Sequence, residues 1–466
     1  MKPLILIVIF QSVALGLSGC ASNSPREAQR DVNHMLQDRS GLAVGTENQS
    51  ALAVKEATRA LLEEPLTAEA AVKLALLNNS ALRAKLEEAG IAQADLVQAG
   101  LLENPRFHGA WRFPSGGGAD HTGRELGITE SFMDILALPL RRKLADAQFE
   151  QAKFRLSDDL LAMTAEVKGD FYGLQAEEQR LALCRTAFET MAAAAKLSAG
   201  QRQAGNVSAL DAMREKAAVE EARLDLQREE AETANRRERL ALLMGVQDMA
   251  EWSLAEILTE LPASDPDLKP LEAAALAQRW DLAAAKKEPL VLKEALRVNR
   301  LGWINGLSVG IDSEKDLDGK FGIGPSVEWN VPLFDRQQAS SAKLRAQSRQ
   351  SGDSIEALES AIRFEVRKAR MDLIAAHQAA GVYRETLLPL QENILNESLK
   401  RYDFMLLGVY QLLQVKRDEL QTQGAYIEAL KDYWTALAEL ERAVGGRIPI
   451  TAPNPPAHEP QNGENP

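Results

Sequence analysis

An alternation of apolar and polar residues between positions 321 and 331 constrains the fold of this chain more than any other feature. A period of two over about ten residues is what a strand requires when one face meets lipid and the other meets water. The pattern therefore predicts that the chain crosses a membrane by strands. The apolar positions are Phe321, Ile323, Val327, Trp329 and Val331.

Three further segments alternate in the same way and begin at Phe107, Leu126 and Leu307. Together the four segments predict two hairpins, at residues 105–133 and 306–332, whose connecting stretches are rich in glycine and charge. Four strands are too few to close a membrane barrel, and an open edge in hydrocarbon leaves backbone groups unpaired at several kcal/mol each. Several copies must therefore share one barrel. The alternative is a pair of soluble hairpins that cap a helical protein.

The first twenty residues contain Lys2, an apolar run over residues 4–17, and then Ser18, Gly19 and Cys20. This arrangement resembles a bacterial lipoprotein signal, in which a cysteine after small residues is acylated and becomes the mature N-terminus. The run is too short to span about 30 Å of hydrocarbon as a helix, so a removed signal peptide over residues 1–19 fits better than a permanent anchor. Ala21 in place of aspartate favours the outer membrane. The alternatives are an unlipidated signal peptide and a buried cysteine.

Composition narrows the class of protein. A net charge of −13 argues against nucleic-acid binding, and a mean hydropathy of −0.24 excludes a polytopic helical membrane protein. Cys184 is the only cysteine beyond Cys20, so no intramolecular disulfide is expected.

The chain repeats itself with an offset of about 200 residues. Leu82 lies over Leu282, and Gly245 lies over Gly445. Seven-residue spacing, as in Leu160, Val167 and Leu174, predicts coiled-coil seams along very long helices. Each half is expected to run through a helix, a hairpin, a very long helix, a tight turn and a long helix. Proline at positions 139 and 332 is expected in the first turn of the helix after each hairpin.

The predicted organisation has six parts. They are the signal peptide at 1–19, a polar tether with some helix at 20–64, a first repeat at 65–250, a linker at 251–267, a second repeat at 268–446, and a disordered Pro-rich tail at 447–466.

Ordered motifs in both halves carry a family resemblance. Residues 66–71 (LTAEAA), 98–105 (QAGLLENP) and 331–335 (VPLFD) look like the corresponding motifs of outer-membrane efflux proteins of the TolC type. The resemblance covers residues 65–446. It implies a mainly α fold with a small β part, in which duplicated coiled-coil helices and two hairpins trimerise into a twelve-stranded barrel and a helical periplasmic tunnel. It also implies a homotrimer in outer-membrane lipid that gives a passive, gated exit from a periplasmic adaptor and an inner-membrane transporter, most often of the RND class.

The tip of the first helical pair is expected at residues 203–211. Gly205 can adopt the left-handed conformation that ends a helix, and Ser208 with Asp211 forms a start signal that resembles a capping box. Val207 and Leu210 are candidates for adaptor docking or for simple packing of the turn.

The second tip, at residues 402–414, departs from the family pattern. Met405 stands where glycine is usual, and Gln411 and Gln414 stand where well-known members carry acidic residues. The hypothesis is that Gln411, Gln414, Tyr402 and Arg417 form the closed gate of the tunnel, and the alternative is that they line solvated helix surfaces. A neutral constriction attracts cations less than a carboxylate ring does.

Catalysis finds no support in the sequence. The five histidines are scattered, and none lies in a recognised metal-binding frame, so no cofactor, metal site or catalytic residue is predicted. His108 and His121 are interpreted as incidental. A lipid-anchored periplasmic coiled-coil scaffold without a pore is the alternative function.

Overall fold

The computed structural model describes residues 26–41, 51–113, 122–205, 207–246, 252–254, 258, 260–262, 271–304 and 307–448. The predicted signal peptide, Cys20 and most of the predicted tail lie outside these residues. No helix in the described part combines the length and the apolar character needed to cross a bilayer.

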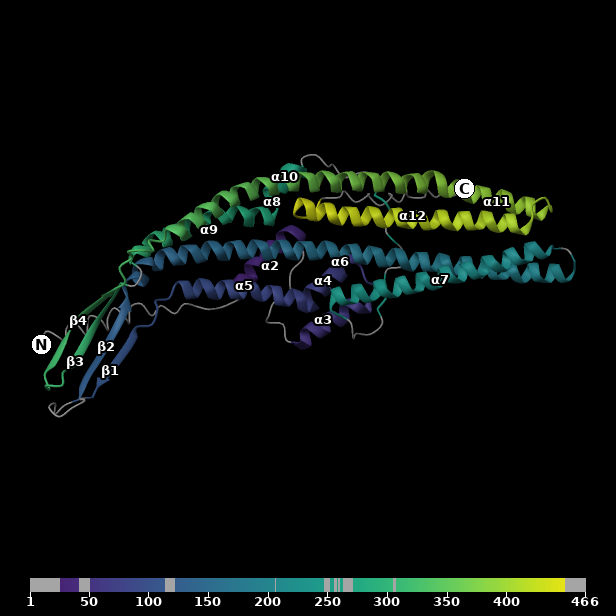
Figure 1. Ribbon diagram of the computed structural model, residues 1–466. Coiled ribbons are helices and arrows are strands. Elements are labelled where there is room, and N and C mark those ends of the chain that lie inside the picture. The colour runs from purple at the N-terminus through teal and green to yellow at the C-terminus, as the bar shows by residue number, and fades with distance from the viewer. Residues whose placement is uncertain are drawn as a thin grey trace, which may run out of the picture. The chain divides into compact units, whose positions relative to one another are not determined.

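The two halves of the chain have the same order of elements, as the internal repeat predicts (Figure 1). The first half runs through α4 (Ala68–Asn78), α5 (Ser80–Ala99), β1 (Arg106–Arg112), β2 (Gly123–Ser131), α6 (Phe132–Gln203) and α7 (Ala209–Met244). The second half runs through α8 (Leu271–Gln278), α9 (Trp280–Arg300), the short 3₁₀ turn η1 (Leu301–Ile304), β3 (Leu307–Lys315), β4 (Phe321–Trp329), α10 (Gln338–Val382), η2 (Tyr383–Leu387), α11 (Leu388–Asp403) and α12 (Val409–Val444).

The chain divides into two compact units. The first contains Met1–Val32, Lys85–Leu156 and Asp281–Glu356, and it holds all four strands; the second contains Asn33–Ala84, Ser157–Trp280 and Ala357–Pro466, and it holds both tips. Each half of the repeat contributes to both units, so the units do not follow the boundaries of the repeats.

The two hairpins form one antiparallel sheet in the order β1-β2-β3-β4. Ile128 pairs with Phe107 on one side and with Ile311 on the other, and Ile311 pairs with Pro325. The next row joins His108, Gly127, Asp312 and Gly324. Side chains alternate between faces along every strand, so this register gathers the large apolar side chains on one face. The charged residues Arg124, Glu130 and Lys315 lie on that face as well.

The core of the second unit lies along the predicted seams. Leu160, Val167 and Leu174 are fully buried, as are Leu373 and Tyr433 from the other half. Aromatic rings extend this core; Tyr172 of α6 lies 5.7 Å from Trp434 of α12, centroid to centroid, and Tyr433 lies 5.7 Å from the His377 ring. Burial of such side chains supplies most of the stability of long helices, because helix propensity alone is weak.

Glycine ends the second helix of each pair in the same way. Gly245 and Gly445 follow α7 and α12 with φ of +69° and +87°. Their backbone N–H groups return to carbonyls of the last helical turn, which glycine permits without a steric penalty. The close contact of Gly245 with Asn78 leaves no room for a side chain there.

The predicted tether carries two helices, α2 (Arg26–Ser40) and α3 (Ala51–Glu63). Val32 and Leu36 of α2 are fully buried, and the Thr58 hydroxyl of α3 hydrogen-bonds with the Asn78 side chain. This segment therefore packs against the helices. The predicted linker also contributes to the core, since Trp252 is buried and its ring lies 4.0 Å below the Arg237 guanidinium.

The expected positions of the two prolines were wrong. Helix α6 begins at Phe132, so Pro139 lies inside it, whereas α10 begins only at Gln338, so Pro332 lies in the segment that connects β4 to this helix. The long helix after the second hairpin is also interrupted, because the π-helical turn η2 separates α10 from α11. Pro389 lies in the first turn of α11. Proline lacks the N–H group that a continuous helix needs at that position.

Candidate functional site: a two-faced sheet and two helical tips

One face of the sheet presents apolar side chains outward. Phe107 is 68% exposed and Val327 is 70% exposed, although both belong to well-formed strands. A contiguous exposed apolar surface of this kind marks a contact with lipid or with another protein. The other exposed large apolar side chains on this face include Trp111, Ile128, Val309, Ile311, Phe321, Ile323 and Trp329.

The opposite face is polar and is crossed by ion pairs. Arg112 of β1 donates to Glu125 of β2 at 2.9 Å and to Glu314 of β3 at 3.0 Å. Glycine occupies much of β4 on this face, and a Cβ added at Gly322 or Gly324 would meet no atom within 4 Å. The face is therefore open above β4.

The first tip joins α6 to α7 and follows the predicted chemistry. Gly205 has a φ of +80°, which only glycine adopts readily. The Ser208 hydroxyl accepts a hydrogen bond from the Asp211 backbone N–H at 3.1 Å and donates to the Asp211 carboxylate at 2.6 Å. Ser208 is therefore the N-cap of α7.

The second tip joins α11 to α12 and uses different residues for the same tasks. Met405 takes the left-handed conformation with a φ of +60°, and its N–H donates to the Tyr402 carbonyl at 2.8 Å. At the start of α12 the Gln411 side chain accepts a hydrogen bond from the Gly408 N–H at 3.1 Å. The side chain of the third helical residue thus satisfies the N-cap backbone, because glycine has no side chain to offer.

The structure brings the predicted gate residues onto the end of one helix hairpin. Gln411, Gln414 and Arg417 are exposed on α12, and Tyr402 is half-buried at the end of α11. Gln414 donates to Asp418 at 2.9 Å. Arg417 lies 3.9 Å from the Met191 sulfur of α6.

Arg417 also acts on a buried carboxyl of α7. Burial raises the pKa of Glu215, and the positive charge of Arg417 opposes that rise. This interaction links α12 to α7 electrostatically within the second unit. It was not anticipated from the sequence, because nothing in the spacing of either helix pairs residue 215 with residue 417.

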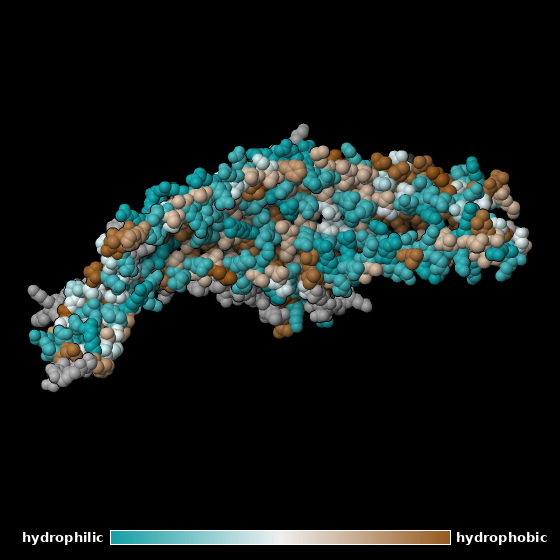
Figure 2. Space-filling model, in the orientation of Figure 1, coloured by the Kyte–Doolittle hydropathy of each residue, from teal (hydrophilic) through white to brown (hydrophobic). Residues whose placement is uncertain are grey.

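Large apolar side chains are exposed around the ends of α11 and α12 (Figure 2). Met405 is 94% exposed, and Phe404 and Leu406 on either side of it are also exposed. The first tip exposes Leu210 and Met213. Sequence reasoning singled out Leu210 and missed the run at 404–406, although three successive apolar residues in a turn were a visible signal.

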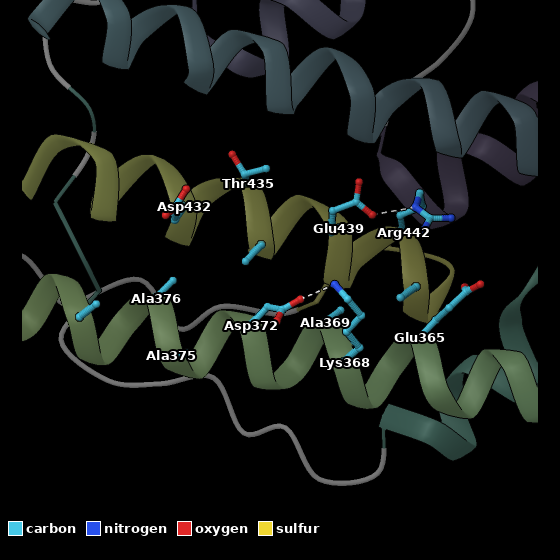
Figure 3. Close-up of a pocket in the computed structure, with 13 residues that line it drawn as sticks. Glu365, Lys368, Ala369, Asp372, Ala375, Ala376, Asp432, Thr435, Glu439 and Arg442 are labelled. Carbon is cyan, nitrogen blue, oxygen red and sulfur yellow. Dashed lines mark hydrogen bonds and ion pairs between the residues drawn. The ribbon is translucent and has the colours of Figure 1, made fainter. Parts of the chain in front are cut away.

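A groove of about 590 Å³ lies between α10 and α12 (Figure 3). Its floor is rich in alanine, including Ala369, Ala376 and Ala443. The charges at its rim pair along each helix, since Lys368 donates to Asp372 at 2.7 Å and Arg442 donates to Glu439 at 3.0 Å. A further lining residue, Glu365, pairs with Arg279 at 2.5 Å. These rim charges therefore have protein partners and do not converge on a ligand.

The chain is similar in sequence and in fold to known proteins. No protein-family model matches the chain. The chain is 24% identical over 388 residues to the cobalt-zinc-cadmium resistance protein CzcC of Cupriavidus metallidurans, covering 82% of this chain and 90% of that protein. It is 25% identical over 435 residues to the outer membrane protein OprJ of Pseudomonas aeruginosa, covering 88% of each. The solved CmeC outer membrane channel of Campylobacter jejuni has the same fold, with a TM-score of 0.66 and 16% identity over 82% of this chain and 86% of that one.

The duplicated helical hairpins and the four-stranded sheet give this chain the fold of solved outer-membrane channel proteins. Over most of its length the chain is similar to outer-membrane efflux proteins of the TolC type, the family that the motifs at residues 66–71 and 331–335 resemble. It is the outer-membrane channel component of an efflux system. Channels of this class trimerise and work with periplasmic adaptors and inner-membrane pumps.

Proposed function

We propose that three copies of this chain form a passive, gated conduit that carries substrate from an inner-membrane pump and a periplasmic adaptor to the outside of the cell. One observation carries the proposal: the sheet has one apolar and one polar face, and β1 and β4 are its outer strands. Pairing β4 of each copy with β1 of the next makes three four-stranded sheets into one closed twelve-stranded barrel. Closure satisfies every edge and leaves the polar face towards water.

The exposed apolar residues at the tips support docking of the adaptor. Phe404, Met405 and Leu406 project from the second tip, and Leu210 and Met213 project from the first. Such residues in solvent favour association, because burial of apolar surface contributes about 25 cal/mol per Å². The proposed partner beyond the adaptor is a transporter of the RND class, which the family resemblance favours.

The proposed membrane attachment has two parts. The barrel inserts in the outer membrane, and acylation of Cys20 adds a lipid anchor on the periplasmic side. Intact-mass measurement of the mature protein tests the second part, with Cys20→Ala as the control. A mature protein that retains residues 1–19, or that carries no acyl mass on Cys20, rules out the anchor.

The name of one relative suggests which class of transported substrate to test first. The relative from Cupriavidus metallidurans is described as a cobalt-zinc-cadmium resistance protein. We therefore propose divalent metal ions as the first class of substrate to examine for this channel.

The test of the conduit is the single-channel conductance of the detergent-extracted full-length protein in a planar bilayer, after its mass has been checked for a trimer. We expect a trimer with a small pore that is mostly closed. A monomer or dimer without conductance, soluble once Cys20 is removed, overturns the conduit and favours the lipid-anchored scaffold.

A further inference from the structure

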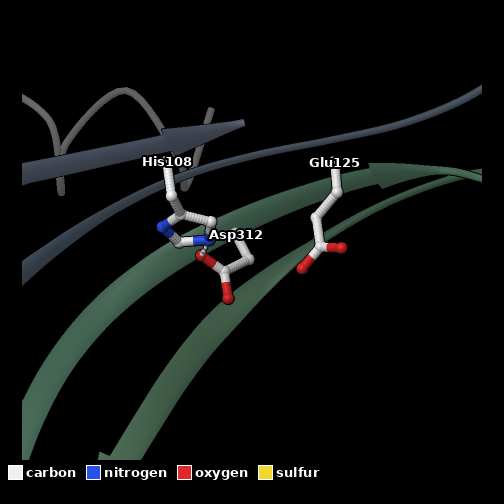
Figure 4. Close-up of side chains that lie close together, drawn as sticks. All are labelled: His108, Glu125 and Asp312. Carbon is white, nitrogen blue, oxygen red and sulfur yellow. Dashed lines mark ion pairs between the residues drawn. The ribbon is translucent and has the colours of Figure 1, made fainter. Parts of the chain in front are cut away.

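Three metal-ligating side chains from three different strands meet on the polar face of the sheet (Figure 4). His108 belongs to β1, Glu125 to β2 and Asp312 to β3. One ligand atom from each lies within 4.8 Å of the ligand atoms of the other two. Imidazole nitrogen and carboxylate oxygen are ligands that zinc and similar divalent cations accept.

A glycine makes this meeting possible. Gly127 stands between His108 and Asp312 in the same cross-strand row. A Cβ at Gly127 would lie 2.0 Å from the nearer Asp312 carboxylate oxygen and 2.3 Å from the His108 ring. The absence of a side chain on β2 therefore lets His108 and Asp312 reach each other across the middle strand.

The distance between these two groups suits a shared cation better than a hydrogen bond. The His108 Nε2 atom lies 3.4 Å from Asp312 Oδ1, and Oδ1 is buried but accepts no hydrogen bond from any described residue. Two ligand atoms each about 2.1 Å from a tetrahedral zinc ion are about 3.4 Å apart. The pair thus already has the spacing of two ligands on one ion, and a change in the Glu125 side-chain conformation supplies the third.

The surrounding charges favour a cation. Glu125, Asp312 and Glu314 contribute three carboxylates, and Arg112, which bridges Glu125 and Glu314, contributes one positive charge. Arg112 contacts one oxygen of Glu125, and the other oxygen is available. Arg106 lies beside His108 on this face and pairs with Glu103 at 4.0 Å.

We propose that His108, Glu125 and Asp312 form a binding site for a divalent cation such as zinc on the polar face of the sheet. Water completes the coordination, because the site is partly exposed. The location of this site on the inner wall of the channel, three sites in each trimer, rests on the proposed function. The existence of the site rests on the geometry of one chain.

The experiment measures Zn²⁺ binding to the purified full-length trimer by isothermal titration calorimetry, and the effect of Zn²⁺ on single-channel conductance in the same preparation. The variants are His108→Ala, which removes a ligand, and Gly127→Ala, which removes no ligand but fills the space between His108 and Asp312. His34→Ala is the matched control, because His34 and Asp38 form an exposed pair at 3.0 Å on α2.

We expect the wild type and His34→Ala to bind Zn²⁺ equally, and both test variants to lose at least about tenfold in affinity while they remain trimeric. We also expect Zn²⁺ to lower cation conductance in the wild type but not in His108→Ala, because a bound dication repels cations in a pore. If the wild-type trimer conducts but binds no Zn²⁺, or if His108→Ala and Gly127→Ala bind as tightly as the control, the site is overturned and the channel stands. If Zn²⁺ binding depends on His108 but no conductance appears without Zn²⁺, the site stands and the conduit is overturned.

Discussion

Glu177 of α6 and Glu229 of α7 bring their carboxyl groups within 4.8 Å of each other, and each residue is only 5% exposed. Each has one basic partner, Arg236 at 3.6 Å for Glu177 and Arg180 at 3.2 Å for Glu229. Two buried carboxylates this close repel each other, and one proton shared between them removes the repulsion. Burial first, and then the hydrogen bond with Glu177, raise the pKa of Glu229 to about 7.

This pair predicts that the helical hairpin is more stable in mild acid than in mild alkali. The folded pKa of Glu229 lies above its ordinary value of 4.5, so the folded state binds the extra proton between these two values. The stabilisation is complete below pH 4.5 and is lost as the pH rises through about 7. We expect Glu229→Gln, which stays neutral, to raise the free energy of unfolding at pH 8 by about 1 to 3 kcal/mol and to flatten its pH dependence.

Thermal unfolding of the trimer between pH 5 and pH 8 measures this effect. Glu220→Gln is the matched control on the same helix, because Glu220 is exposed and pairs with Arg223. The interpretation fails if Glu229→Gln and Glu220→Gln show the same pH dependence as the wild type.

Opposite glycine substitutions at the two tips test their backbone conformations. Met405 has a φ of +60°, which costs a residue with a side chain about 1 to 2 kcal/mol, whereas Gly205 has a φ of +80° and open space around it. We expect Met405→Gly to stabilise the second tip by about 0.5 to 1 kcal/mol, after the entropy of glycine is subtracted, and Gly205→Ala to destabilise the first by about 1 kcal/mol.

Hydrogen exchange of the tip amides measures both changes locally. The amide of Leu406, which donates to the Arg401 carbonyl at 2.8 Å, reports the second tip. Leu406→Gly is the control, because it adds glycine without relieving the Met405 conformation. Faster exchange of the tip amides in Met405→Gly than in the wild type contradicts the prediction.

The strands and the buried seams of the long helices could be predicted from the sequence, because local residue patterns determine them. Alternation with a period of two identifies the strands, and seven-residue spacing identifies the seam at Leu160, Val167 and Leu174, because both patterns report which side of an element is covered. The interruption at Tyr383–Leu387 is less visible, since a single π-helical turn is a short departure within a long helical pattern. Burial of Val32 depends on long-range packing that no local pattern encodes.

The contact between His108 and Asp312 on the polar face of the sheet could not be predicted from local patterns either. His108 and Asp312 are 204 positions apart, and each looks incidental in its own strand. Their contact requires the register of three strands and the missing side chain of Gly127. By contrast, the N-cap formed by Ser208 and Asp211 is predicted from three-residue spacing alone, because a cap needs only neighbouring residues.

Adjacent residues on β4 test which face of the sheet meets lipid. Ile323 is on the apolar face, and Gly322 is on the open polar face. An arginine facing hydrocarbon costs about 2 to 4 kcal/mol per copy, whereas one facing water costs little. We expect Ile323→Arg to reduce insertion of the trimer into liposomes and Gly322→Arg to leave insertion unchanged. Equal insertion of the two variants contradicts the assignment of the faces.

The gate proposal predicts the behaviour of the closed pore. If Gln411 and Gln414 constrict the tunnel, replacing both with alanine removes their hydrogen bonds and widens the pore, so the closed-state current in a planar bilayer should increase. Gln411→Ala also removes the hydrogen bond that Gly408 donates at the start of α12, which contributes about 1 kcal/mol. Thr67→Ala controls for the loss of a cap, because Thr67 caps α4 through the Ala70 N–H at 3.2 Å.

A larger closed current in the double variant, together with a normal current in Thr67→Ala, assigns the constriction to the two glutamines. An unchanged closed current in the double variant excludes them from the gate. In that case Gln411 serves only to begin α12, and Gln414 serves only as the donor to Asp418 that the structure gives it.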